Sequence, residues 1–344
     1  MGVRARGAAF RFVVGCRFVV GFRFVSLLAA VCLLALPGRF GTAAAQDLTP
    51  VVIQCATGGS FELFTACQSA VLAAQAMRGG IAFADAMGAS LSGSSSTLGR
   101  RLGSSPRVSA DLRFRLARFN MPDILAGGTG AAGANTVYAY AVKGSVAVGV
   151  IDGFSLMPTV GGILSLDLLA SGGLVFLGES DGFGGNEGLL SVGGRLGILR
   201  ESFTLPGVTV SAMRSFGQHV DWADATDSQQ IDADISTTSV RAIVGKDFFT
   251  LAVLAGMGWD WDRGELGVQV PDPSMPGGQG IAAMEDLTTR RTVYFAGVSI
   301  TRLIYQFSIE GGWVEGYDAM LGYPGAYDPT AITPFVSVAA RFTY

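Results

Sequence analysis

The chain has 344 residues, of which 49% are hydrophobic and only 15% are charged, and it contains 49 glycines. Soluble domains carry about 25% charged residues and about 7% glycine. This composition excludes a disordered chain, which combines low hydrophobicity with high net charge. A net charge of -3 and only two lysines, Lys143 and Lys246, exclude a Lys-rich binding surface, so no nucleic-acid partner is expected.

The first segment has the composition of an export signal. Residues 1–45 contain six arginines and no acidic residue, and an apolar stretch runs from Phe24 to Leu36. Ala43, Ala44 and Ala45 provide a small-residue cleavage site before Gln46. The segment is therefore predicted to be a secretory signal peptide. The alternative is an uncleaved anchor helix, although the apolar stretch is shorter than the ~20 residues that a membrane span needs.

Removal of the signal makes the chain acidic and leaves two cysteines. The basic residues fall from 24 to 18 while all 27 acidic residues remain, so the mature net charge is about -9. Cys55 and Cys67 are the remaining cysteines. In an exported chain such a pair is predicted to form one disulfide, with two buried free thiols as the alternative.

Residues 46–105 are predicted to form a short, partly helical segment ahead of the main domain. They hold the cysteine pair, an Ala-rich stretch at Phe61–Met87 that fits one or two helices, and a Gly/Ser cluster at Gly88–Ser96. From Arg107 onward the hydrophobic pattern changes to a period of two, which sets the boundary. The segment is expected to plug the following domain or to cap it on the periplasmic side.

Residues 106–344 carry about ten segments in which apolar and polar residues alternate. In the first of them Val108, Leu112 and Phe114 alternate with Asp111 and Arg113. The others lie at residues 138–150, 164–176, 190–198, 208–212, 234–245, 251–261, 294–300, 305–313 and 336–344. Segments of this length with one apolar face are typical of membrane β-barrels. We predict an all-β fold, a transmembrane antiparallel up-and-down β-barrel of about ten strands, in contact with lipid of the bacterial outer membrane.

The connections and the aromatic residues support this prediction. Long connections, expected outside the cell, alternate with short ones, expected in the periplasm. The long ones lie at residues 120–134, 178–188, 218–231, 263–288 and 317–332. Tyr138, Trp259 and Trp313 are near segment ends on the apolar side, as in interfacial girdles.

Two other architectures fit parts of the pattern. A soluble β-sandwich also alternates, but ordinary strands have about 5–6 residues and several segments here are longer. A transmembrane helix at Val160–Gly178 has sufficient length, but it would place Asp167 near its centre at a cost of about 3 kcal/mol.

The C-terminus carries a resemblance to a class of proteins. Apolar residues alternate from Ser337 up to Phe342 and the final Tyr344. This resembles the C-terminal insertion signal of bacterial outer-membrane β-barrel proteins, and it implies recognition by the barrel assembly machinery. Residues 46–105 are also slightly similar to the N-terminal hatch of the fatty-acid channel proteins. The Asn-Pro-Ala motif of that hatch is absent and ten strands are too few for that family, so its ligand-binding residues are not carried over.

The polar phases place charges of both signs inside the predicted barrel. These lumen-lining residues are Asp111, Arg113, Arg115, Lys143, Asp167, Arg195, Asp260, Glu310 and Arg341, with Arg241 less clearly in phase. Mixed signs favour internal ion pairs, and side chains fill much of the interior of a narrow barrel. We predict a narrow or plugged channel for a small solute, gated by residues 46–105. The second hypothesis is a structural or surface-interaction barrel whose acidic loops meet an external partner or cations.

One sequence feature suggests catalysis. His219, the sole histidine, and Asp221 resemble the His/Asp half of the omptin outer-membrane proteases, in which a carboxylate orients a general base. That family needs a second acidic pair across the barrel rim, for which Asp181, or Asp260 with Asp262, are the candidates. A serine triad would have to use the same histidine. We therefore expect no catalytic residue and no enzyme activity, with an outer-membrane hydrolase as the third hypothesis.

Acidic residues around His219 raise the question of a metal site. They are Asp221, Asp224, Asp227, Asp232 and Asp234. Hard oxygen ligands suit calcium, but no loop has the spaced D-x-D-x-D-G pattern. A solvated acidic face is expected, with no bound metal and no cofactor.

Overall fold

The computed structural model describes residues 47–99, 106–124, 133–155, 163–178, 181–216, 218–223, 229–272, 274, 277–317 and 325–344, without the side chains of 285 and 286. The predicted signal peptide, Asp224 and Asp227 lie outside these residues. Within this part of the chain, no helix is both long enough and apolar enough to span a membrane.

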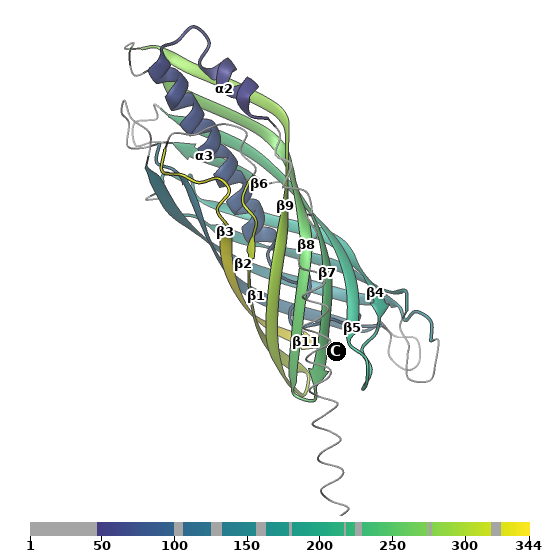
Figure 1. Ribbon diagram of the computed structural model, residues 1–344. Helices are drawn as coiled ribbons and strands as arrows, with labels where there is room; N and C mark the ends of the chain where they lie inside the picture. Colours follow the sequence, from purple (N-terminus) through teal and green to yellow (C-terminus); the bar gives the residue numbers. More distant parts are fainter. Residues whose placement is uncertain are drawn as a thin grey trace, which may run out of the picture. The chain divides into compact units, whose positions relative to one another are not determined.

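A single antiparallel sheet closes on itself. Its strands are β1 (Val108–Pro122), β2 (Ala134–Ile151), β3 (Ser165–Phe176), β4 (Asn186–Leu199), β5 (Gly207–Phe216), β6 (Gln218–Ala223), β7 (Gln230–Phe248), β8 (Leu251–Pro271), β9 (Gln279–Arg302), β10 (Tyr305–Val314) and β11 (Thr333–Thr343). Except for β5 and β6, neighbours in sequence pair with one another, and β1 pairs with β11. Because β5 and β6 both pair with β7, they share one place in the wall (Figure 1). The predicted up-and-down barrel of about ten strands is confirmed.

The lengths of the connections orient the barrel. Two residues, Phe249 and Thr250, join β7 to β8, and Leu303 and Ile304 join β9 to β10. Phe249 and Leu303 have φ angles of 61° and 58°, in the left-handed region that tight turns use. In outer-membrane barrels the short turns are periplasmic. The opposite end, where β8 passes into β9, therefore faces outside.

Three strands are much longer than a membrane crossing requires. β7, β8 and β9 have 19, 21 and 24 residues, whereas about 9–11 tilted residues span a bilayer. Their surplus, residues 230–235, 263–271 and 279–288, together with β6, forms a wall that we call the extracellular extension. The predicted loops at 218–231 and 263–288 are wrong over most of their length. Asp221 and Glu265 lie on the outer face of strands, while Leu266, Val268 and Val270 point inward and are buried.

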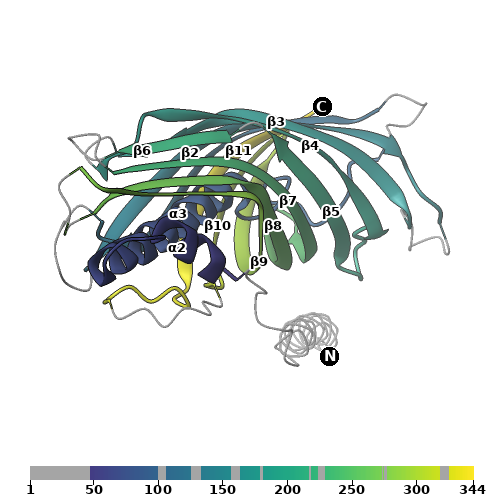
Figure 2. The same ribbon diagram turned by 90° about the horizontal axis from the view of Figure 1, so that it is seen from above.

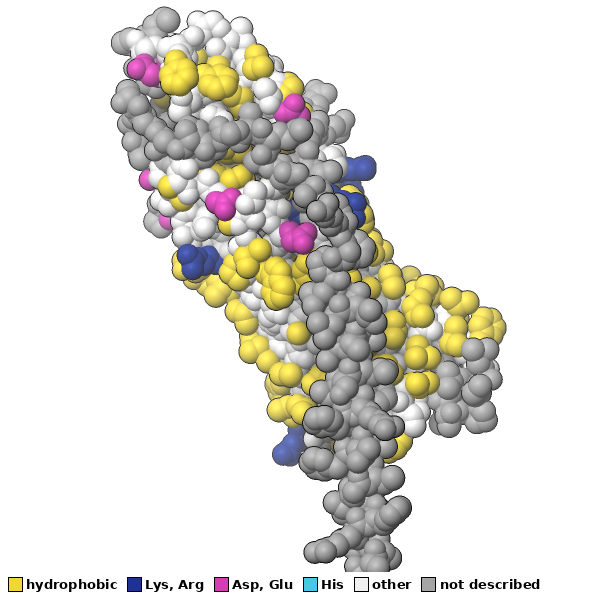
Figure 3. Space-filling view, in the orientation of Figure 1, with side chains coloured by type: hydrophobic (Ala, Val, Ile, Leu, Met, Phe, Trp, Pro, Cys, Tyr) yellow, Lys and Arg dark blue, Asp and Glu magenta, His cyan; other side chains and the backbone are white. Residues whose placement is uncertain are grey.

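Outside this extension, the outer face of the barrel is apolar. Leu112, Phe114, Leu168, Val298 and Ile309 are each about half exposed, with Leu168 at 54%. We call this surface the lipid belt; hydrophobic side chains gather on the lower part of the face in Figure 3, and acidic ones lie on its upper part. β3 occupies Ser165–Phe176, so the helix considered at 160–178 is excluded. A closed sheet with such a belt is an outer-membrane barrel.

Aromatic side chains lie where the lipid belt meets the extension. The rings of Tyr294 and Trp313 are 5.8 Å apart. The Arg290 guanidinium is 5.9 Å from the centre of the Trp259 ring and 5.8 Å from that of Trp261. Amphipathic rings prefer this position at a membrane interface.

The N-terminal segment lies inside the barrel. It forms α2 (Thr49–Cys55) and α3 (Phe61–Ala86), and α3 contacts β1, β7 and β8, beside which it lies in Figure 2. The Ala-rich stretch is thus one helix, which begins where Ser60 Oγ accepts a hydrogen bond from Leu63 N at 3.1 Å. Its buried residues surround the helix on all sides from Cys67 to Asp85, as expected of an enclosed helix. Cys55 and Cys67 form the predicted disulfide.

The interior of the extension is an apolar core. Val71 and Leu72 of α3 pack there with Trp222 of β6, Ile235 of β7 and Leu266 of β8, and all five are buried. The small side chains of α3 allow the wall to approach closely, for example at Gly80, which lies against the Phe119 ring. The apolar contacts fix the extracellular end of the plug.

Candidate functional site

The lumen within the lipid belt is filled by the chain between α3 and β1. Residues 87–99, which we call the linker, run from the end of α3 towards the periplasmic turns. Gly88, Gly93 and Gly99 have φ angles of 76°, 63° and 65°. The linker therefore adopts, at these three positions, a backbone conformation that residues other than glycine rarely adopt. A Cβ on Gly93 would lie 2.9 Å from Ser299 Cβ, which shows how close the linker runs to the wall.

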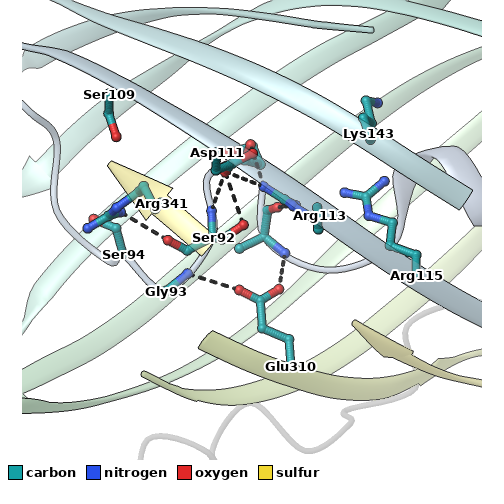
Figure 4. A network of polar contacts seen from close by, with 12 residues as sticks. Ser92, Gly93, Ser94, Ser109, Asp111, Arg113, Arg115, Lys143, Glu310 and Arg341 are labelled. Atoms are coloured by element: carbon teal, nitrogen blue, oxygen red, sulfur yellow. Dashed lines mark hydrogen bonds and ion pairs between the residues drawn. The ribbon is translucent and has the colours of Figure 1, made fainter. Parts of the chain in front are cut away.

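Two carboxylates of the wall bind the backbone of the linker (Figure 4). Asp111 Oδ2 accepts hydrogen bonds from Ser92 N at 3.1 Å and Ser92 Oγ at 3.0 Å, and it pairs with Arg113 Nη2 at 2.9 Å. Glu310 accepts from Ala89 N at 3.0 Å and from Gly93 N at 3.1 Å. The wall thus supplies acceptors for linker N–H groups that have no partner in a strand or helix.

A third carboxylate holds the periplasmic end of the linker. Asp167 Oδ2 pairs with Arg195 Nη2 at 2.7 Å, and both side chains are fully buried. The Asp167 carboxylate also accepts from Leu98 N at 3.0 Å. Next to it, the hydroxyl oxygens of Thr97 and Ser165 are 2.5 Å apart.

The C-terminal end of α3 is bound by a buried polar cluster. Lys143 Nζ lies 2.5 Å from Asp85 Oδ1 and 3.0 Å from Ser191 Oγ. Ser215 Oγ donates to Asp85, and Arg115 donates to the Asp85 carbonyl oxygen. Here the helix contributes the acid and the wall contributes the base.

A ring of arginines marks the boundary between the polar lumen and the apolar core. Arg78 of α3 donates to the carbonyl oxygens of Asp262 at 2.6 Å and Leu287 at 2.7 Å. Arg291 donates to Gly79 O at 2.5 Å, and its guanidinium is 5.0 Å from the centre of the Tyr317 ring. Arg241 pairs with Asp260 at 2.7 Å.

The structure places all nine predicted lumen-lining residues on the inner face. Eight of them are buried and Arg341 is half-buried, with its Nη1 3.0 Å from Ser92 O. Sequence reasoning missed three further buried residues: Arg78, Asp85, which pairs with Lys143, and Arg291. Charged residues within an Ala-rich helix were the available signal for the first two. Phe342 and Tyr344, the predicted insertion signal, end the barrel at β11, where the Phe342 ring is 5.7 Å from that of Tyr305.

Little free space remains in the lumen. Beside Asp85 and Lys143 a cavity of about 20 Å³ remains, which is room for on the order of one water molecule. A larger cavity of about 290 Å³ lies at the extracellular side, between Gly80 of α3, Phe119 of β1 and Arg291 of β9. Among the described residues, the lumen is filled at the level of the linker, and above it a cavity remains beside α3.

His219 lies on the outside of the extension and not in the lumen. Its neighbours Gln218 and Val220 are buried, while the imidazole is 52% exposed. The hydrogen bond between Nδ1 and Asp234 Oδ1, 2.7 Å long, raises the pKa of His219 above its usual value. Asp260 and Asp262, candidates for the opposing acidic pair, are buried inside with Arg241 and Arg291. Asp260 and Asp262 therefore do not face His219 across the rim.

The comparisons with known proteins give only distant structural similarity. No protein-family model matches the chain, and no curated protein matches its sequence. One similar solved structure is the translocator domain of the autotransporter NalP from Neisseria meningitidis, with 11% identity, a TM-score of 0.34, and 70% of this chain and 88% of that chain covered. The outer membrane protease OmpT from Escherichia coli has 10% identity, a TM-score of 0.36, and coverage of 73% and 100%. The Pseudomonas putida toluene transporter TodX has 8% identity, a TM-score of 0.30, and coverage of 74% and 96%.

Similarity at this level carries no argument about activity. The assignment rests on the structure itself, namely the closure of β5 on β7, the lipid belt and the occupied polar lumen. The chain is a bacterial outer-membrane β-barrel whose interior is filled by its own N-terminal segment.

Proposed function

We propose that the protein is a gated, narrow channel for small polar solutes, in which the linker is the gate, and that it is not an enzyme. One observation carries the proposal. The contacts that close the lumen inside the lipid belt are mostly polar and charged, with one small apolar cluster around Leu91 and Leu98, whereas those that hold α3 in the extension are mostly apolar.

This difference sets which part of the plug is easier to displace. A hydrogen bond to a charged group that is exchanged for water costs about 1.5–3 kcal/mol net. Exposure of apolar surface costs about 25 cal/mol per Å². The apolar side chains around Trp222 and Leu266 would form no hydrogen bonds with water to offset this cost. Movement of the linker therefore opens the lumen at lower cost than withdrawal of α3.

The extracellular cavity supports a small, polar solute. Arg118, Asn120, Arg291 and Asp328 contribute to its lining, beside Tyr327. Polar groups of both signs favour an uncharged, hydrogen-bonding molecule over a hydrocarbon. To reach Asp85 and Lys143 and then the linker, a solute would have to pass the close contact between Gly80 and the Phe119 ring.

The test is a reversible lock on the gate. The hydroxyls of Thr97 and Ser165 touch, so the double variant Thr97→Cys/Ser165→Cys joins the linker to β3 when oxidised. In proteoliposomes, we expect the oxidised variant to lose uptake of a small sugar and to regain it on reduction. The reductant also breaks the native disulfide Cys55–Cys67. Wild-type protein treated with the same reductant is therefore the control.

A second variant loosens the gate. Glu310→Gln weakens the bonds to Ala89 and Gly93 and should raise conductance in planar bilayers, whereas Glu265→Gln, exposed on the extension, should not. If wild-type, locked and loosened proteins, each verified as folded by heat-modifiable migration, are equally impermeable, the channel proposal fails.

The extension favours a second candidate function. Its strands rise beyond the lipid belt with a polar and acidic outer face. A surface-interaction barrel would use this face and would keep the lumen closed. In that case, substitutions that remove the contacts of the linker would leave binding to the external partner unchanged.

A further inference from the structure

Two neighbouring cross-strand pairs bring four ionisable side chains together on the outside of the extension. β6 and β7 place His219 opposite Asp234 and Asp221 opposite Asp232. Because residues two apart share a face of a strand, all four side chains point outward. Like charges directly opposite one another destabilise a sheet. No Lys or Arg among the described residues forms an ion pair with these aspartates.

The distances between three of these side chains fit a metal centre. His219 Nε2 is 3.2 Å from Asp221 Oδ1 and 3.7 Å from Asp232 Oδ2. One ligand atom from each of the three residues lies within 4.8 Å of the others. With metal–ligand bonds of about 2.0–2.2 Å, neighbouring ligand atoms of a tetrahedral zinc ion are roughly 3.4 Å apart. The two measured distances bracket that value.

The fourth side chain orients the imidazole. His219 Nδ1 is 2.7 Å from Asp234 Oδ1, so the Nδ1 hydrogen is donated to this carboxylate and the lone pair is left on Nε2. That lone pair then faces two anionic oxygens, an arrangement that a cation between them stabilises. A carboxylate that accepts from the second nitrogen is the usual partner of a metal-bound histidine.

We propose that His219, Asp221 and Asp232 bind one divalent transition-metal ion, with zinc as the best match, and that Asp234 is a positioning residue. The imidazole nitrogen favours zinc over calcium or magnesium, which prefer oxygen ligands alone. Water fills the remaining coordination positions, because the four side chains are more than half exposed. The ion would join β6 to β7 outside the lipid belt, and the site does not depend on the proposed channel.

The experiment uses the mature protein in detergent with a purification tag that contains no histidine. Since the chain has one histidine, any imidazole coordination reports on His219. Isothermal titration with Zn²⁺ is expected to give one ion per chain, and Co²⁺ is expected to give a visible d–d absorption spectrum. His219→Ala and Asp232→Asn should each weaken Zn²⁺ binding by at least ~100-fold, and Asp234→Asn by about 10–100-fold with the ligands still present.

Glu265→Gln, an exposed carboxylate on the neighbouring strand, is the matched control and should leave binding unchanged. Three results would overturn the proposal: no uptake of Zn²⁺ at neutral pH, equal Zn²⁺ binding by His219→Ala and wild type, or displacement of Zn²⁺ by equimolar Ca²⁺. The first would mean that protonation of His219 alone balances the aspartates. The others would mean an acidic surface without a metal centre.

Discussion

The lipid belt and the extracellular extension have opposite polarity although the same strands build both. On β8, Trp259 and Trp261 face lipid while Asp260 and Asp262 are buried inside; beyond the bulge at Gly264, Leu266 points inward. Where lipid surrounds the wall, the outer side chains must be apolar. Where water surrounds it, the outer side chains are polar and the apolar ones face inward. The surroundings, and not the sheet, decide which face of a strand is apolar.

The plug follows the same division. In the extension α3 is held by apolar packing, and within the lipid belt the linker is held by carboxylates of the wall. The lumen is polar here because the apolar residues of these strands are needed on the outside. A plug that crosses both regions must therefore change its own polarity along its length.

The largest expected effect is in the polar half of the lumen. Asp167→Ala leaves Arg195 buried without a partner and removes an acceptor for Leu98 N. Loss of one member of a buried pair costs about 3–5 kcal/mol. We expect a decrease of that size in the free energy of unfolding, measured with urea in detergent micelles.

The double variant Asp167→Leu/Arg195→Met is the control for this effect. Replacement of both partners by apolar side chains is often neutral, so it should recover most of the lost stability. A decrease below about 1 kcal/mol for Asp167→Ala would show that the linker does not depend on this pair.

Much of the wall is predictable from the sequence, because a period of two reports which positions share a face. Asp111 and Asp167 are correctly placed inside on this basis alone. The extension is not predictable in the same way. On β7 the inward Ile231 and the outward Asp232 alternate as clearly as Asp111 and Leu112 do on β1, but here the apolar residue faces inward. The pattern alone does not state whether lipid or water surrounds the wall.

The contacts between the plug and the wall could not be predicted from the sequence either. Asp85 meets Lys143 only because α3 stops at Ala86 and the barrel closes around it. The two residues are 58 positions apart in the sequence. Which wall residue meets Asp85 depends on how deeply the helix enters the lumen. Local periodicity contains no information on that depth.

A matched pair of arginine substitutions tests the change of surroundings. Leu168 in the lipid belt and Ile281 on the extension are similarly exposed on the outer face, at 54% and 61%. Leu168→Arg should cost about 2–4 kcal/mol of folding free energy in a bilayer, whereas Ile281→Arg should stay within about 0.5 kcal/mol. Folding titrations in lipid vesicles measure both. Equal costs would mean that the extension is also immersed in lipid.

The smallest expected effect concerns the first turn of α3. Ser60→Ala removes the cap on Leu63 N and the hydrogen bond from Ser60 Oγ to Asp272 Oδ1. The cap is worth about 1 kcal/mol. We expect faster amide exchange in the first turn of the helix and unchanged exchange in the linker, followed by mass spectrometry. Ser60→Thr, which retains a hydroxyl, should restore the protection.

The path of the N-terminal segment constrains the order of assembly. α2 lies against β9 at the extracellular end, and the chain then crosses the whole lumen before β1 begins at the periplasmic end. A finished barrel has no free cross-section through which a disulfide-linked helical hairpin can thread. Pairing of β1 with β11 as the last step would let the wall close around a segment that is already in position.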